Sequence, residues 1–267
     1  MALKVAMGQY YPGSSVLHRL DPRAKLVGSL VCMVGALFIG NAAQLALATV
    51  LTLAFVALSR VPLGKVLESA STLIAFLVVI GLFNLFVVQT GTELVHVWIV
   101  RITTDGVWAA ALYSWRFALL LLVGLVLLLT TTPTQLADAF ESLLSPLAGL
   151  GVPVHELAMV LSLALRFVPT LANEANQVMD AQAARGGSLE TGTPAQRVRG
   201  LVSVAVPLFA GAIRHADTVS KALDARGFEG GARRSHWHPM RMQLRDGIFL
   251  ACCAAYVAAL VALGILL

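Results

Sequence analysis

Charged side chains are scarce in this chain of 267 residues. They make up 12% of the sequence, against roughly 25% in ordinary soluble domains. Hydrophobic residues reach 58%, and the mean hydropathy is +0.82. This balance argues against a soluble globular domain and favours an integral membrane protein surrounded by lipid.

Catalytic and metal-binding signatures are also missing. The sequence holds no G-x-x-x-x-G-K-[ST] phosphate loop, no nucleophile elbow, no H-E-x-x-H and no carboxylate pair. We therefore expect neither ATP hydrolysis by this chain nor any other enzymatic activity, and no cofactor. Cys32, Cys252 and Cys253 lie in apolar runs without disulfide or metal spacing. His236 and His238 diverge on a helix and lack a third ligand, so no metal site is expected.

The formal net charge of +5 raises the question of nucleic-acid binding. The basic residues, however, have no aromatic-interleaved platform or groove-reading motif around them, and they flank apolar runs. We interpret them as topology signals at the cytoplasmic ends of membrane helices. No nucleic-acid partner is expected.

The chain begins with a polar segment, 1–25, which is expected to be cytoplasmic. Near its end, Asp21 before Pro22 signals a helix start. Five apolar runs follow and predict membrane helices. Four runs fall within 26–131, and the first two form a tight hairpin. The fifth, within 247–267, has 20 uncharged residues, enough to cross a hydrocarbon core of about 30 Å. Five crossings would place the N-terminus inside and the C-terminus outside. The runs cover 26–39, 42–58, 69–88, 107–129 and 248–267.

Two features interrupt the membrane region. Residues 93–105 alternate weakly and are rich in β-branched side chains, which predicts an extended external loop or a small hairpin. Arg116 lies inside the fourth run, where a charge is costly and should face protein or the external surface. We favour a structural role for Arg116, paired with Asn84, Gln89 or Asp105, over a role in transport.

Residues 132–246 have a higher charge density and predict a cytoplasmic or interfacial domain. A short amphipathic helix is expected over 136–144, followed by two long helices over 153–185 and 193–226. The second has a capping box, with Thr193 at the N-cap, a proline next and a glutamine at the third position. Each helix also has an internal proline, so the two look like similar arms.

Each long helix ends in the same three residues, Ala-Arg-Gly. An arginine in the last turn complements the helix dipole, and the glycine after it suits a left-handed C′ position. Either copy alone could be an ordinary helix end. Two copies, each closing its own helix, favour a shared role for the exposed guanidinium groups. The motifs are Ala184, Arg185, Gly186 and Ala225, Arg226, Gly227.

At this point the sequence closely resembles the transmembrane coupling (T) components, EcfT, of energy-coupling factor transporters, which are ABC-type importers of vitamins and trace metals. The stretches that carry the resemblance are Gly8-Gln9-Tyr10, the segment 17–25, the segment 163–169 and both Ala-Arg-Gly motifs. The resemblance covers nearly the whole chain. It implies an all-α fold with about five transmembrane helices plus long coupling helices, in a bacterial plasma membrane.

The resemblance also implies partners. Two coupling helices cross, and the arginines Arg185 and Arg226 each dock in a groove of one of two ABC ATPase subunits, against carboxylates. From the residues themselves, we expect the amphipathic face of the second long helix, which begins at Val198, to contact a substrate-binding S component in the membrane plane. The residues of this chain expected at that contact are Leu201, Ala205, Leu208, Ala212 and Ala216.

Three alternatives remain open from the sequence. The chain could be the T subunit of a dedicated cobalt or nickel importer, serving one S component instead of several. From other classes, it could be a membrane scaffold without transport, or a membrane enzyme that lacks any recognisable catalytic constellation. The transported vitamin or ion is not encoded here, because that selectivity would belong to the S component.

Overall fold

The computed structural model describes residues 10–97, 100–186, 193–228 and 242–266. The chain divides into two compact units. We call residues Gly8–Ala139 with Met240–Leu267 the bundle unit, and residues Phe140–Pro239 the arm unit. The division falls at residues 139 and 239, whereas the expected limits of the coupling-helix domain are 132 and 246.

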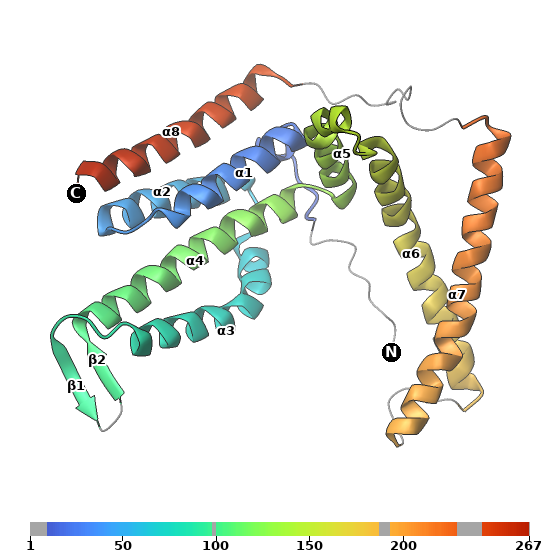
Figure 1. The fold of residues 1–267 in the computed structure, drawn as a ribbon, viewed down its shortest axis with the longest axis horizontal. Coiled ribbons are helices and arrows are strands. Elements are labelled where there is room, and N and C mark those ends of the chain that lie inside the picture. Colours follow the sequence, from blue (N-terminus) through green and yellow to red (C-terminus); the bar gives the residue numbers. More distant parts are fainter. Residues whose placement is uncertain (1–9, 98–99, 187–192, 229–241, 267) are drawn as a thin grey trace. The chain divides into compact units, whose positions relative to one another are not determined.

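The bundle unit consists of long helices and one small hairpin. Strand β1 (Glu93–Val97) pairs antiparallel with β2 (Val100–Thr103) at the connection between α3 and α4 (Figure 1). This confirms the small hairpin expected over 93–105. The helices are α1 (Pro22–Leu37), α2 (Ala42–Ser59), α3 (Leu63–Val87), α4 (Thr104–Thr130) and α8 (Leu244–Leu266).

Side chains close in sequence cap the starts of α1 and α2, and the first of these caps was expected. The Asp21 carboxylate caps α1 by accepting a hydrogen bond from the Arg23 amide at 2.9 Å. In the α1–α2 turn, the Gln44 side chain accepts from the amides of Gly40 at 2.8 Å and Asn41 at 3.1 Å. Amides at a helix N-terminus have no partner within the helix, so these side chains supply one. A short turn joins α1 to α2 as predicted, but the two helices pack mainly against α4 and α8 and not against each other.

Close packing of α1 against α8 defines one side of the bundle. A Cβ atom at Gly28 would lie 2.4 Å from Phe249 Cε1, and one at Gly35 would lie 2.8 Å from Val257 Cγ2. Such contacts are too short for real atoms, so a side chain at either position would force Phe249 or Val257 to move. One buried cluster then joins the helices: Ala36, Ile39, Ala48, Leu119, Tyr256 and Leu260.

A buried polar cluster ties three helix ends together. The ammonium group of Lys25, which is 2% exposed, donates to the Thr130 carbonyl at the end of α4, at 3.1 Å. Asp246, also buried, accepts from the Asp21 amide at 2.8 Å and from the Gln243 amide at 2.7 Å. Buried charges need such partners. The cluster therefore fixes the starts of α1 and α8 against the end of α4.

Arg116 in α4 has partners that the sequence did not indicate. Its Nη1 donates to the carbonyls of Leu37 at 3.1 Å and Ile39 at 3.3 Å, at the end of α1. Its guanidinium also lies 4.7 Å from the centre of the Tyr113 ring. A cation at a helix C-terminus satisfies carbonyls that have no partner within the helix. The predicted pairing with Asn84, Gln89 or Asp105 is therefore wrong.

Five helices in the described part of the chain are long and apolar enough to cross a membrane, which agrees with the expected number. The set differs from the five predicted runs. It contains α2, α4 and α8, and also α6 (Val154–Ala184) and α7 (Pro194–Ala225), which have the lowest mean hydropathies, 1.4 and 1.2. Helix α1, with 16 residues, is too short to qualify, and α3 contributes the apolar part Ile74–Val87.

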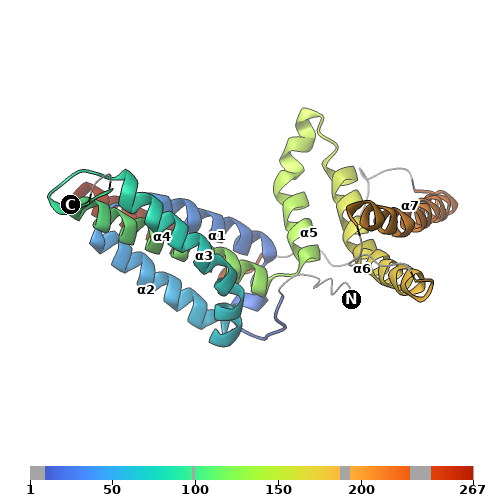
Figure 2. The ribbon, with the colours of Figure 1, turned by 90° about the horizontal axis from the view of Figure 1, so that it is seen from below.

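The arm unit is built on α6 and α7. The boundary between the two units falls within α5 (Pro133–Leu144), which starts three residues before the expected 136, and a 3₁₀ segment (Ser145–Leu150) follows before α6. Helices α6 and α7 lie side by side and run in opposite directions (Figures 1 and 2). Pro169 and Pro207 lie within them, and both helices continue through these positions.

Candidate functional site

The starts of both arm helices match the sequence analysis. Pro153 is the N-cap of α6. At α7, the Thr193 hydroxyl accepts from the Gln196 amide at 3.4 Å, and the Gln196 side chain accepts from the Thr193 amide at 2.9 Å, with Pro194 at the first helical position. The capping box is therefore confirmed. It fixes where α7 begins.

The end of α6 has the backbone conformation that Ala-Arg-Gly predicts. Arg185 is the C-cap, and its amide donates to the Gln182 carbonyl at 3.1 Å. Gly186 follows in the left-handed region, with φ +80°, and its amide donates to the Ala183 carbonyl at 2.9 Å. The helix stops because a left-handed residue redirects the chain. Ala184, Arg185 and Gly186 are all exposed.

The end of α7 repeats this geometry. Gly227 has φ +66°, and its amide donates to the Asp224 carbonyl at 3.0 Å. The Phe228 amide donates to the Leu223 carbonyl at 3.1 Å, which completes a Schellman motif. Ala225, Arg226 and Gly227 are exposed. Neither arginine of the two motifs forms an ion pair with another residue that the structure describes, so both guanidinium groups are open to a partner from outside.

The two helices cross where polar and small residues meet. His215 Nε2 of α7 lies 2.6 Å from Glu174 Oε1 of α6, and the Phe167 ring lies 5.8 Å from the His215 ring. Gly211 is buried at this crossing, and a Cβ atom there would lie 3.1 Å from Glu174 Oε2. The absence of a side chain at Gly211 leaves room for the Glu174 carboxylate. These residues define the crossing point of the arms.

The crossing places the two motifs symmetrically. Arg185 lies eleven residues beyond Glu174, and Arg226 lies eleven residues beyond His215. At a rise of 1.5 Å per residue each arginine is about 16 Å from the crossing, and antiparallel helices put the two at opposite ends, roughly 30 Å apart. Sequence reasoning found two similar arms, but their opposite directions were missed because no local pattern encodes them.

The residues expected to face an S component are divided between two environments. Leu201 is 63% exposed, and Ala216 is also exposed, whereas Ala205, Leu208 and Ala212 are half-buried. Ala212 and Ala216 line a groove of about 440 Å³ between α6 and α7. Part of the expected face is therefore directed towards α6.

A neighbouring stripe of α7 is more exposed and more apolar. Its residues recur at steps of three or four, which places them on one side of the helix. Their exposed fractions lie between 52% and 70%. The sequence could have indicated this stripe, because the apolar face of α7 is wider than contact with one helix requires. The sequence did not show which part of that face α6 covers. The stripe consists of Val198, Val202, Val206, Phe209 and Ile213.

No metal was expected at His236 and His238, and both residues lie outside the described part of the chain. The same is true of three nearby basic residues, Arg233, Arg234 and Arg241. Within the described ranges, no three His, Cys, Asp or Glu side chains are grouped as a metal site would need. The chemistry that the arm unit offers is therefore the exposed guanidinium pair together with the apolar stripe.

Comparison with known proteins gives a consistent result. A family model for cobalt transport proteins, CbiQ, matches residues 13–237. EcfT transmembrane proteins of energy-coupling factor transporters are similar over most of their length: that of Streptococcus equi is 36% identical over 259 residues, covering 93% of this chain and 96% of its own. That of Thermosediminibacter oceani is 37% identical over 243 residues, covering 91% of each.

A longer relative has a different name. A protein of Bifidobacterium longum, named as an ABC transporter ATP-binding protein, is 50% identical over 252 residues. The match covers 94% of this chain but only 32% of the longer protein. The chain therefore spans about a third of that relative and nearly all of the EcfT proteins.

Proposed function

Because this chain belongs to the CbiQ family and is the EcfT-type, multi-pass transmembrane component of an energy-coupling factor transporter, we propose that it couples ATP hydrolysis to import. Two ABC ATPase subunits would supply the energy, and a membrane-embedded S component would bind the substrate. The chain itself is the non-catalytic subunit between them.

The symmetric position of the two motifs carries this proposal. Both arginines are exposed, each immediately precedes a left-handed glycine, and each lies eleven residues beyond the crossing residue of its own helix. A planar guanidinium can bind a carboxylate through two parallel hydrogen bonds. Two equivalent sites roughly 30 Å apart suit two separate subunits better than two contacts on one.

The B. longum relative supports an ATPase neighbour. This chain has no phosphate loop, and it matches only a third of a protein whose name is that of an ATP-binding protein. We infer that the ATP-binding part of that relative lies outside the matched third. A region like this chain and an ATP-binding region would then share one polypeptide there, which favours direct contact between the corresponding separate chains here.

The S component is proposed to bind the apolar side of α7. Leu201, Leu208 and the alanines of the expected face supply one edge of this surface, and Phe209 and Ile213 supply the more exposed edge. Exposed apolar stripes of this size mark sites of protein or lipid contact. Movement of the arms would reach the S component through this surface.

Vitamins or other micronutrients are the proposed cargo class. A dedicated cobalt importer is the second candidate, favoured by the description of the matching family model. Affinity purification followed by mass spectrometry separates the two, because several co-purifying S components indicate a shared module and one indicates a dedicated importer.

Replacement of both motif arginines tests the coupling proposal. In Arg185→Ala/Arg226→Ala, we expect loss of ATPase binding and of uptake, since truncating one partner of a buried charged pair costs about 2 to 5 kcal/mol. Arg197→Ala/Arg199→Ala is the matched control, because it removes two exposed arginines at the start of α7 and should leave both readouts intact. ATPase binding and uptake that survive in the motif double variant would contradict the proposal.

A further inference from the structure

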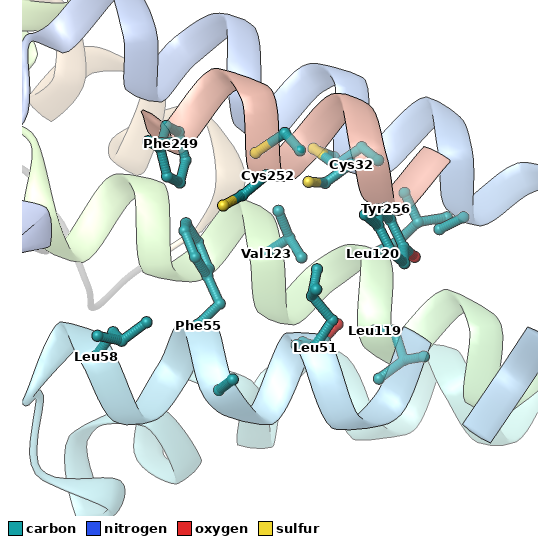
Figure 3. Close-up of a pocket in the computed structure, with 15 residues that line it drawn as sticks. Cys32, Leu51, Phe55, Leu58, Leu119, Leu120, Val123, Phe249, Cys252 and Tyr256 are labelled. Carbon is teal, nitrogen blue, oxygen red and sulfur yellow. The ribbon is translucent and has the colours of Figure 1, made fainter. Parts of the chain in front are cut away.

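A cavity of about 140 Å³ lies inside the bundle unit, among α1, α2, α4 and α8 (Figure 3). Aliphatic, aromatic and sulfur-bearing side chains dominate its wall, among them Leu51 and Phe55 of α2 and Phe249 and Cys252 of α8. Water in a protein cavity needs two to four polar partners. The hydroxyls of Thr52 and Tyr256 are the oxygen atoms among the lining side chains, and the rest of the wall is aliphatic, aromatic or sulfur-bearing, so an apolar occupant fits better than water.

The packing of α8 explains why the cavity exists. Gly28 and Gly35 bring α1 tightly against α8. Helix α2, by contrast, meets α8 near two separated points: the Gln44 side-chain amide donates to the Leu260 carbonyl at 2.8 Å, and the rings of Phe55 and Phe249 stack at 5.9 Å. The gap lies between these points and is held open at both ends.

The cavity is continuous with the outer surface of α2 and α8. Three of its lining residues, Ala54, Leu58 and Cys252, are exposed. Both helices have the length and hydropathy of membrane spans, with mean hydropathies of 2.0 and 2.5. In a multi-pass membrane protein, the medium that meets such a surface is the acyl-chain region of the bilayer.

We propose that this cavity binds the end of a lipid acyl chain that enters between α2 and α8. Its volume resembles that of an apolar cavity of about 150 Å³ that stays dry and binds benzene, so it suits a short alkyl segment and not a whole lipid. An empty cavity forfeits the dispersion contacts of its wall, and an alkyl segment restores them. The occupant would act as a spacer between α2 and α8. This site is separate from the arms and does not depend on the proposed coupling function.

Photolabelling tests the site. The full chain is reconstituted in nanodiscs that contain phosphatidylcholine with a diazirine near the end of one acyl chain. After illumination, peptide mapping should place the label on the wall of the cavity, at Phe55, Phe249 or their neighbours. In Ala54→Phe, a ring at the mouth fills the space and this labelling should be lost. Ala57→Phe is the matched control, because Ala57 is also exposed on α2 but does not line the cavity, and its labelling should equal that of the unmodified protein.

A second measurement covers the case in which a variant folds poorly. Phosphatidylcholine added to the delipidated protein in detergent should raise the thermal midpoint of the unmodified protein and of Ala57→Phe more than that of Ala54→Phe. Equal labelling in all three proteins would overturn the proposal, as would an equal loss in both variants. Loss of labelling when an S component binds would also overturn it, because a protein side chain would then be the occupant.

Discussion

The glycines of the two motifs allow a test of backbone geometry without steric interference. Gly186 and Gly227 have φ of +80° and +66°, and among the described residues no heavy atom outside the chain neighbours lies within 4 Å of a Cβ atom built on either. A substitution to alanine therefore meets no clash. Its cost comes from the left-handed conformation alone, which is about 1 to 2 kcal/mol for an ordinary L-residue and less for asparagine.

The expected loss of ATPase binding can be worked out if the left-handed cap is the conformation that binds an ATPase subunit. Each alanine should then weaken binding by about 5-fold to 30-fold, since 1.4 kcal/mol corresponds to a factor of ten. The two caps lie roughly 30 Å apart, and effects at such distances usually add in free energy. Gly186→Ala/Gly227→Ala should therefore weaken binding by the product of the two factors, whereas Gly186→Asn/Gly227→Asn should recover most of the loss.

A binding titration of the purified ATPase subunits against each variant in nanodiscs measures this difference. Thermal unfolding of the isolated variants is the control, because both substitutions lie on exposed caps and should leave the midpoint of the bundle unit unchanged. Asparagine variants that bind as weakly as the alanine variants would refute the reasoning, because side-chain bulk would then be the cause. Alanine variants that bind normally would show that the cap conformation is irrelevant.

Two further predictions concern the arms. A double-mutant cycle with Glu174→Ala and His215→Ala should give a coupling energy of about 0.5 to 1 kcal/mol, because the side chains are 33% and 38% exposed and exposed pairs contribute little. Denaturant unfolding of the unmodified protein, the two single variants and the double variant measures this energy. If the two destabilisations simply add, the pair does not interact at the crossing. Phe209→Asp should reduce binding of an S component more than Leu208→Asp, because Phe209 is 70% exposed and Leu208 half-buried. The amount of S component that co-purifies with each variant measures the effect, and ATPase binding is the control for folding. A larger loss in Leu208→Asp than in Phe209→Asp would place the interface on the side of α7 that carries Leu208.

Short-range patterns in the sequence were sufficient for the ends of the helices. The Asp21 cap, the Thr193 capping box and both left-handed glycines are confirmed. Each depends on side chains and dihedral angles within a few residues, so the information is local. The abundance of apolar residues likewise determined the membrane class, because it depends on composition and not on arrangement.

Tertiary structure decided which groups meet. Arg116 binds carbonyls at the end of α1, and Lys25 binds the end of α4, in each case across a long separation in the sequence. The antiparallel crossing at Glu174 and His215 also decides which part of the apolar face of α7 stays exposed. Periodicity shows that a face is apolar, but another helix and the membrane both cover apolar faces. The sequence by itself therefore determined the two arginine caps, and only the packing of α6 against α7 placed them at opposite ends of one crossed pair.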